Sequence, residues 1–168
     1  MGFRKTTTKD INCVMNIIKK SQEYFKSQGI DQWQNDYPNP GVIQNDINNN
    51  NSYVLIKEGN IVATSAVSFD GESTYDKIYE GQWLSEEKYA VIHRIAVDDS
   101  YKGLGIAGKI INEVEKLCLE KEVKSIKIDT HQDNISMQKS LEKNGFKYCG
   151  LIYLTDGNKR VAFEKTLN

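Results

Sequence analysis

The sequence predicts a mixed α/β domain with α+β-like character, in which a central sheet of about seven strands carries helices on both faces. Three observations favour this class: short β-rich runs, longer segments whose apolar residues recur at helical spacing, and the way these segments follow one another. With 168 residues, of which 39% are hydrophobic and 27% charged, the chain is long enough for a substantial core. We therefore expect a single domain over residues 1–168.

The first half of the chain predicts a strand over 2–7, a long amphipathic helix between Thr8 and Gly29, a short helix over 42–50 and a hairpin over 52–69. Thr8 is a residue type that caps helix N-termini. Pro38 and Pro40 mark residues 30–41 as a loop. Glu58-Gly59-Asn60 separates the two hairpin strands, and its glycine can supply a left-handed position.

The second half predicts a strand over 88–97, a helix from Leu104, a strand over 125–130, a helix over 134–144 and a final hairpin over 146–167. Residues 70–87, which precede these elements, are polar and irregular. Gly145 closes the last helix, and Asp156-Gly157 joins the last two strands. The predicted order is β-α-α-β-β-β-α-β-α-β-β.

The charge composition argues against nucleic acid and membrane partners. The 22 basic and 23 acidic residues give a formal net charge of −1, so the protein has no overall positive field. No apolar run has the length of a secretion signal or a bilayer span, and we expect a cytoplasmic protein. Cys13, Cys118 and Cys149 lack the spacing of a metal site or a disulfide framework, so we predict no metal and place Cys118 in the core.

A glycine-rich turn at the start of the helix after residue 103 carries the strongest functional signal. Glycines let the backbone approach a ligand closely, while the first amides of a helix lack intrahelical partners and carry partial positive charge. Together these properties favour a pyrophosphate ligand. We expect this ligand to be held by the backbone of Lys102, Gly103, Leu104, Gly105, Ile106, Ala107 and Gly108, with the Lys102 side chain as a cation at the mouth.

Two alternatives for this turn remain open. Gly103 to Gly108 also satisfies the G-x-G-x-x-G pattern of dinucleotide-binding folds, which would indicate an NAD(P)-dependent oxidoreductase. Against it, the linker Asp98 to Lys102 separates the turn from its strand, and no second mononucleotide half follows. A turn that only connects strand to helix is the other alternative.

Two blocks of the sequence resemble the GNAT N-acetyltransferase superfamily. VIHRIAVDDSYKGLGIAGKII is similar to its signature, a strand ending in Val, a short loop and then [Q/R]-x-x-G-x-[G/A]. Lys102, Gly105 and Ala107 occupy the defining positions, and Lys102 departs from the usual Gln or Arg but keeps a donor. IDTHQDNISMQKSLEKNGF resembles the second block, a strand, T-x-x-x-N and a helix ending in G-F. The predicted element order also resembles the GNAT fold across nearly the whole chain.

The resemblance implies a GNAT-type acyl-CoA N-acyltransferase fold and direct transfer of an acetyl group from acetyl-CoA to an amine, without a covalent enzyme intermediate. It implies that the pantetheine arm pairs with the backbone of Ile95, Ala96 and Val97, where a free amide would polarise the thioester carbonyl. Asn134 matches the family Asn that contacts the cofactor. Dimers are common in the family, which leaves a homodimer open.

The general base and acid are less defined. Period-two alternation puts Val91, His93, Ile95 and Val97 on one face, and some relatives carry a His at the position of His93. A strand histidine with a purely structural hydrogen bond remains the alternative. The family's usual Tyr acid corresponds here to Leu141, so the candidate acids are Tyr148 and Tyr153, for which simple packing is an alternative.

The acceptor is a small-molecule or peptide amine that the sequence does not specify. The resemblance implies that the pocket is bordered by the first helix pair and by the loop before the strand 88–97. Those regions carry Gln32, Trp33, Tyr37, Trp83 and Glu86. Their acids, together with Glu72, are equally consistent with a solvated face, and Trp33 with a loop anchor. The missing tyrosine also leaves a non-catalytic acetyl-CoA sensor open.

Overall fold

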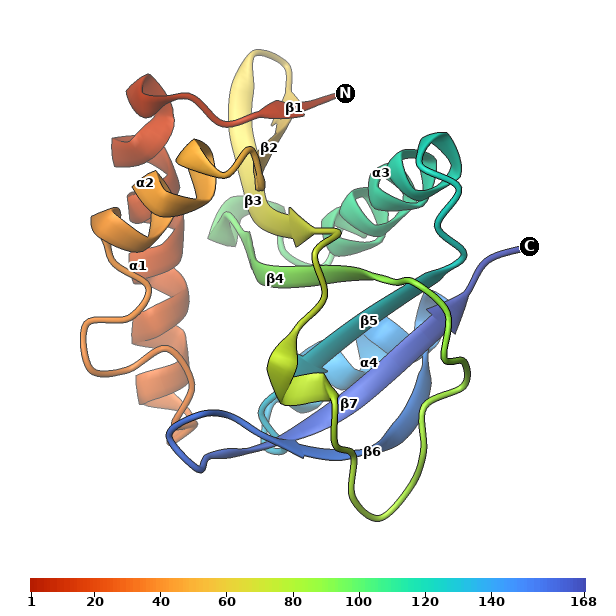
Figure 1. Cartoon of the computed structure of the whole chain (residues 1–168). Helices are drawn as coiled ribbons and strands as arrows, with labels where there is room; N and C mark the ends of the chain where they lie inside the picture. Colours follow the sequence, from red (N-terminus) through yellow and green to blue (C-terminus); the bar gives the residue numbers. More distant parts are fainter. The chain divides into compact units, whose positions relative to one another are not determined.

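The computed structural model describes residues 1–168 and contains seven strands and four α-helices (Figure 1). The strands are β1 (Gly2–Lys5), β2 (Ser52–Lys57), β3 (Asn60–Ser68), β4 (Ala90–Val97), β5 (Ser125–Thr130), β6 (Lys147–Tyr153) and β7 (Lys159–Thr166). The helices are α1 (Ile11–Ser27), α2 (Pro40–Asn48), α3 (Ile106–Glu120) and α4 (Ile135–Lys143). The strands follow the order β1-β2-β3-β4-β5-β7-β6, so the predicted mixed class and order of elements are confirmed. None of the helices combines the length and the apolar character that a bilayer crossing requires.

The chain divides into two compact units, which are described separately. The first consists of Met1–Val67 and Arg94–Glu113, and the second of Ser68–His93 and Val114–Asn168. Both β4 and α3 therefore contribute residues to each unit.

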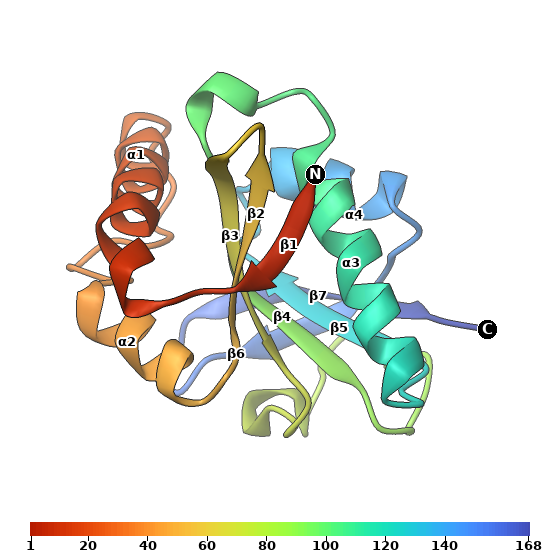
Figure 2. The same cartoon turned by 90° about the horizontal axis from the view of Figure 1, so that it is seen from above.

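In the first unit, β1, β2 and β3 form an antiparallel sheet. Helix α1 and the beginning of α3 lie on opposite sides of these strands (Figures 1 and 2). The apolar stripe of α1 faces the strands, because Val14 and Ile18, one turn apart, are both fully buried. Their core cluster contains Val14, Met15, Ile17, Ile18, Ile43, Val54 and Ala96.

Two helix starts differ from the prediction. Thr7, rather than Thr8, forms a capping box with Asp10 around a 3-10 turn (Thr8–Asp10), and α1 begins only after this turn. Helix α2 begins at Pro40, which the sequence predicts in the loop. The reason is local: Asn39 Oδ1 accepts a hydrogen bond from Val42 N at 3.1 Å, and proline fits the first helical position.

In the second unit, β5 lies between two neighbours of opposite sense. It pairs in parallel with β4 through Ala90–Ile126 and Val91–Lys127, and antiparallel with β7, whose other neighbour is β6. Helix α4 lies behind this sheet in Figure 1, and the segment that follows β3 lies in front. One core cluster of this unit contains Tyr75, Val91, Ile152 and Ala162.

The irregular segment before β4 is fixed to β5 and β7 by polar contacts. The fully buried Glu164 carboxylate accepts hydrogen bonds from Leu84 N at 2.8 Å and from Ser85 Oγ at 2.8 Å. The Lys127 ammonium lies 4.3 Å from the ring centroid of Trp83 and 4.1 Å from that of Tyr89. The segment 70–89 is therefore ordered although its sequence has no periodicity.

Candidate functional site

The glycine-rich turn lies wholly in the first unit. Gly103 and Gly105 have φ values of +78° and +75°, in the left-handed region that favours glycine. A Cβ atom on either glycine would meet nothing within 4 Å. The backbone conformation, rather than crowding by the chain itself, therefore accounts for glycine here, and the space above the turn is open.

The start of α3 offers amides to a ligand. The residue before the helix is Gly105, which has no side chain to cap it, and the Lys109 amide donates to Gly105 O at 3.2 Å as the first helical turn closes. Helix geometry leaves the amides of Ile106, Ala107 and Gly108 without an i−4 acceptor. This end of α3 has the properties of an anion site.

Lys102 has a partner within the turn. Its Nζ lies 2.9 Å from Asp99 Oδ1 and 4.5 Å from the ring centroid of Tyr24. The predicted cation is thus present beside the turn, but Asp99 offsets part of its charge.

Strand β4 is not regular at its centre. Arg94 has a φ of +54°, a left-handed conformation that is rare for a non-glycine residue inside a strand. The left-handed residue interrupts the two-residue repeat on which the predicted shared face of His93 and Ile95 depends. Ile95 and Ala96 are buried, and Val97 is half-buried.

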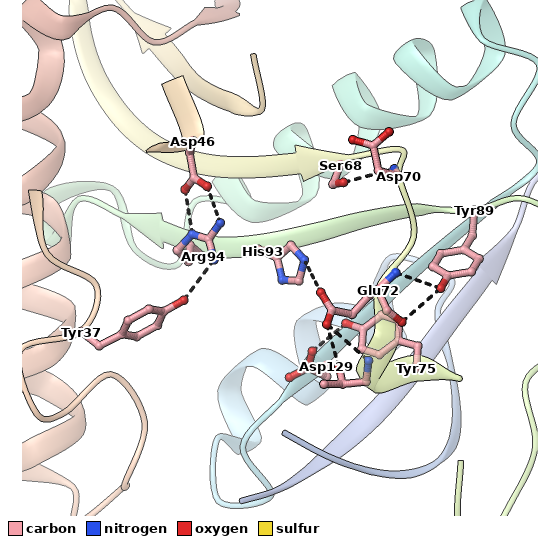
Figure 3. A network of polar contacts seen from close by, with 11 residues as sticks. Tyr37, Asp46, Ser68, Asp70, Glu72, Tyr75, Tyr89, His93, Arg94 and Asp129 are labelled. Carbon is pink, nitrogen blue, oxygen red and sulfur yellow. Dashed lines mark hydrogen bonds and ion pairs between the residues drawn. The ribbon is translucent and has the colours of Figure 1, made fainter. Parts of the chain in front are cut away.

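The Arg94 side chain is held by two groups of the first unit (Figure 3). Its Nε and Nη2 donate to the two carboxylate oxygens of Asp46 on α2, at 2.9 and 2.7 Å, and Nη1 donates to the Tyr37 hydroxyl at 3.0 Å. Burial opposes the charge of Arg94, but Tyr37 and Asp46 outweigh this effect and raise the pKa of the guanidinium. The pair is bidentate and strongly favours the charged form of arginine.

In the second unit, His93 faces a carboxylate that was not among the predicted site residues (Figure 3). Its Nε2 lies 3.6 Å from Glu72 Oε2, and both side chains are about three-quarters buried, with exposed fractions of 24% and 28%. The other oxygen, Glu72 Oε1, accepts from Thr74 Oγ1 at 2.9 Å. Glu72 is thus held in place rather than part of a solvated face.

A buried pair lies close to Glu72 in the same unit. The Tyr75 hydroxyl donates to Asp129 Oδ2 at 2.6 Å, and Arg160 Nε lies 3.9 Å from Asp129 Oδ1. Burial raises the pKa of Asp129 against the opposing effects of Tyr75 and Arg160. The pKa of Tyr75 is also raised by burial and by the neighbouring carboxylate. These groups, with the Tyr89 hydroxyl that accepts from Glu72 N at 3.2 Å, form a titratable cluster around His93 and Glu72.

The remaining predicted residues have structural contacts. Asn134 is buried and caps α4, since its Oδ1 accepts from Met137 N at 3.2 Å. Tyr148 and Tyr153 are surface residues whose rings meet Phe163 and Tyr79 edge-on.

Among the acceptor candidates, Trp33 packs edge-on against Phe25 in the first unit, next to the half-buried Gln32. Trp83 Nε1, in the second unit, donates to the Tyr75 carbonyl at 2.9 Å. Both tryptophans therefore anchor loops within their own unit.

Comparisons with known proteins point to one family. A family model described as the acetyltransferase (GNAT) family matches residues 15–146. A GNAT-family acetyltransferase structure from Streptococcus agalactiae is 34% identical, with a TM-score of 0.90 over 99% of this chain and 95% of that chain.

More distant structures share the fold. A GNAT-family acetyltransferase from Listeria monocytogenes is 20% identical, with a TM-score of 0.75 over 99% of this chain and 94% of that chain. AAC(6')-Ib in complex with ribostamycin and coenzyme A is 19% identical, with a TM-score of 0.69 over 98% and 92% of the two chains. No curated protein sequence matches the chain. The matched residues include the uncapped start of α3 and the left-handed glycines before it. The chain therefore belongs to the GNAT acetyltransferase family.

Proposed function

We propose that the protein is an acetyl-CoA-dependent N-acetyltransferase, and that the turn 102–108 binds the pyrophosphate of coenzyme A. One observation carries the proposal: the open, uncapped start of α3 behind Gly103 and Gly105, whose φ values let backbone amides face an anion. Family membership supports the choice of coenzyme A over a nicotinamide cofactor. Because the family match includes residues of both units, we also propose that 1–168 acts as one catalytic domain.

The proposed reaction forms a nitrogen–carbon bond and breaks the thioester. A neutral amine attacks the thioester carbonyl, the carbon–sulfur bond breaks, and coenzyme A leaves as a thiolate. Backbone amides of Ile95–Val97 would stabilise the negative charge that develops on the carbonyl oxygen. His93, which directly precedes the left-handed Arg94, would accept the proton of the incoming ammonium, and Glu72 would stabilise the resulting imidazolium.

The acceptor class remains a primary amine, on a small molecule or a peptide. Solvent can protonate the departing thiolate, and Tyr148 and Tyr153 stay candidates for this step because they are exposed. A second function, an acetyl-CoA sensor, is favoured only by Leu141, which is fully buried where many relatives carry the tyrosine acid. The sensor would bind acetyl-CoA but release no thiol with any amine.

Gly105→Val tests the proposed turn. A Cβ atom at this position meets no atom of the protein within 4 Å, although the φ of +75° strains any side chain. The variant should therefore fold with lower stability, and it should lose most of its acetyl-CoA affinity because the side chain occupies the space proposed for the phosphates. Gly157→Val is the matched control, since Gly157 also has a positive φ, of +86°, and open space around it. Isothermal titration with acetyl-CoA and a free-thiol assay over a panel of amines measure binding and turnover. Wild-type affinity in the Gly105 variant would refute the assignment of the turn.

A further inference from the structure

Arg94 adopts a conformation that its residue type disfavours. A non-glycine residue at φ +54° in a strand has an energetic cost, and such a conformation persists only where the surroundings enforce it. Glycine would adopt it without this cost. The sequence therefore retains an arginine where the backbone alone would favour glycine, which indicates that the side chain has a role.

The surroundings that enforce the conformation are visible in Figure 3. Asp46 on α2 binds the guanidinium through both carboxylate oxygens, and its side chain is 8% exposed. Tyr37, from the loop before α2, accepts a third hydrogen bond from Nη1 at 3.0 Å. Three hydrogen bonds to a planar group fix its position and orientation, so the backbone that carries it has little freedom.

We propose that Asp46 and Tyr37 are positioning residues that hold the left-handed turn at Arg94 and thereby aim the following peptides of β4 at the thioester. A left-handed residue turns the backbone out of the extended conformation, so the next residue, Ile95, departs from the regular ladder. The inference rests on the proposed function, because it concerns the strand segment that we assign to acetyl-CoA. It adds that helix α2, which does not belong to the predicted cofactor-binding segments, controls the geometry of the acetyl site.

A pair of double variants separates the backbone effect from the lost side-chain contacts. Asp46→Asn/Arg94→Gly and Asp46→Asn/Arg94→Ala both remove the ion pair, and they differ only in the Cβ atom. Since glycine accepts the left-handed conformation, the glycine variant should keep kcat within about threefold of Asp46→Asn alone. The alanine variant should lose about tenfold or more, because its backbone relaxes to a regular strand.

Two controls distinguish positioning from stability. Glu58, in the β2–β3 turn, is also left-handed, with a φ of +51°. The variants Glu58→Gly and Glu58→Ala therefore repeat the comparison away from the proposed site. They should differ in urea midpoint but not in kcat. If the two double variants have equal kcat and the wild type is active, the positioning role is overturned while the proposed function stands. A wild-type protein that binds no acetyl-CoA would overturn the proposed function and this inference with it.

Discussion

At the scale of single residues, the charge of Glu72 decides how His93 can act. A carboxylate 3.6 Å from Nε2 can stabilise the imidazolium that forms when His93 accepts a proton. The Tyr89 hydroxyl accepts a hydrogen bond from the Glu72 amide, and burial raises the pKa of the neighbouring Asp129.

Glu72→Gln should lower kcat/KM by about tenfold or more, because the imidazolium that forms when His93 accepts a proton loses its charged partner. The measurement is the rate of thiol release with acetyl-CoA and a fixed amine. Glu87→Gln, a change to an exposed acid of the same segment, should leave this rate unchanged. A wild-type rate in the Glu72 variant would remove Glu72 from the mechanism.

Residues whose role depends on local chemistry could be predicted from the sequence, and residues whose role depends on distant partners could not. Gly103 and Gly105 could be placed at a turn from sequence, because only glycine adopts their conformation freely. Glu72 could not, since it lies in an irregular segment and meets His93 only through the fold. The left-handed conformation of Arg94 could not be predicted either, because its partner Asp46 lies 48 residues earlier in the chain.

At the scale of elements, the start of α1 illustrates how a polar cluster sets a boundary. Arg4 on β1 donates to Asp10 at 2.8 Å, and the same carboxylate accepts the Thr7 amide at 2.7 Å. The Arg4 hydrogen bond is the main reason that the pKa of Asp10 is lowered to about 2. Strand β1 and the turn before α1 are thereby joined through one carboxylate.

Asp10→Asn should destabilise the protein in a pH-dependent manner. The folded-state pKa lies below the ordinary 3.8, so the ionised carboxylate stabilises the fold above about pH 4, and this contribution is lost as pH falls toward 2. Since Arg4 is partly exposed, we expect a loss of about 1 kcal/mol at pH 7 and roughly half of that at pH 3. Urea unfolding at the two pH values measures it. A loss that is equal or larger at pH 3 would contradict the assignment.

Element types were predictable because their periodicities are local. The strand 125–130 and the final hairpin were predicted closely, whereas the starts of α1 and α2 shifted by one to three residues. The capping partners Asp10 and Asn39 explain both shifts, and neither has a unique signal in the sequence. Short polar side chains serve equally well in loops and at caps.

At the scale of the whole molecule, the order of elements was predictable but the order of strands was not. The sequence indicates that β6 and β7 form a hairpin. It does not indicate that β7, rather than β6, lies next to β5, because either strand could present an edge to it. Long-range pairing is set by the packing of complete faces, to which no single motif corresponds.

Acetyl-CoA should raise the melting temperature of the whole chain, and NAD or NADP should not. A ligand at one hundred times its Kd stabilises the native state by about 2.7 kcal/mol, which corresponds to roughly 5–10 °C for a chain of this size. Differential scanning fluorimetry with each cofactor measures the shift. A shift with NADP and none with acetyl-CoA would instead support an oxidoreductase.

Each of the two compact units contains one tryptophan, whose fluorescence can report on the state of that unit. The chain has two tryptophans, and Trp33 belongs to the first unit while Trp83 belongs to the second. Their surroundings differ, since the indole of Trp83 lies beside the Lys127 ammonium and that of Trp33 beside the Phe25 ring. Variants with a single indole, made by Trp33→Phe or Trp83→Phe, would follow the two units separately by fluorescence, and coincident curves would mean that they melt as one cooperative body.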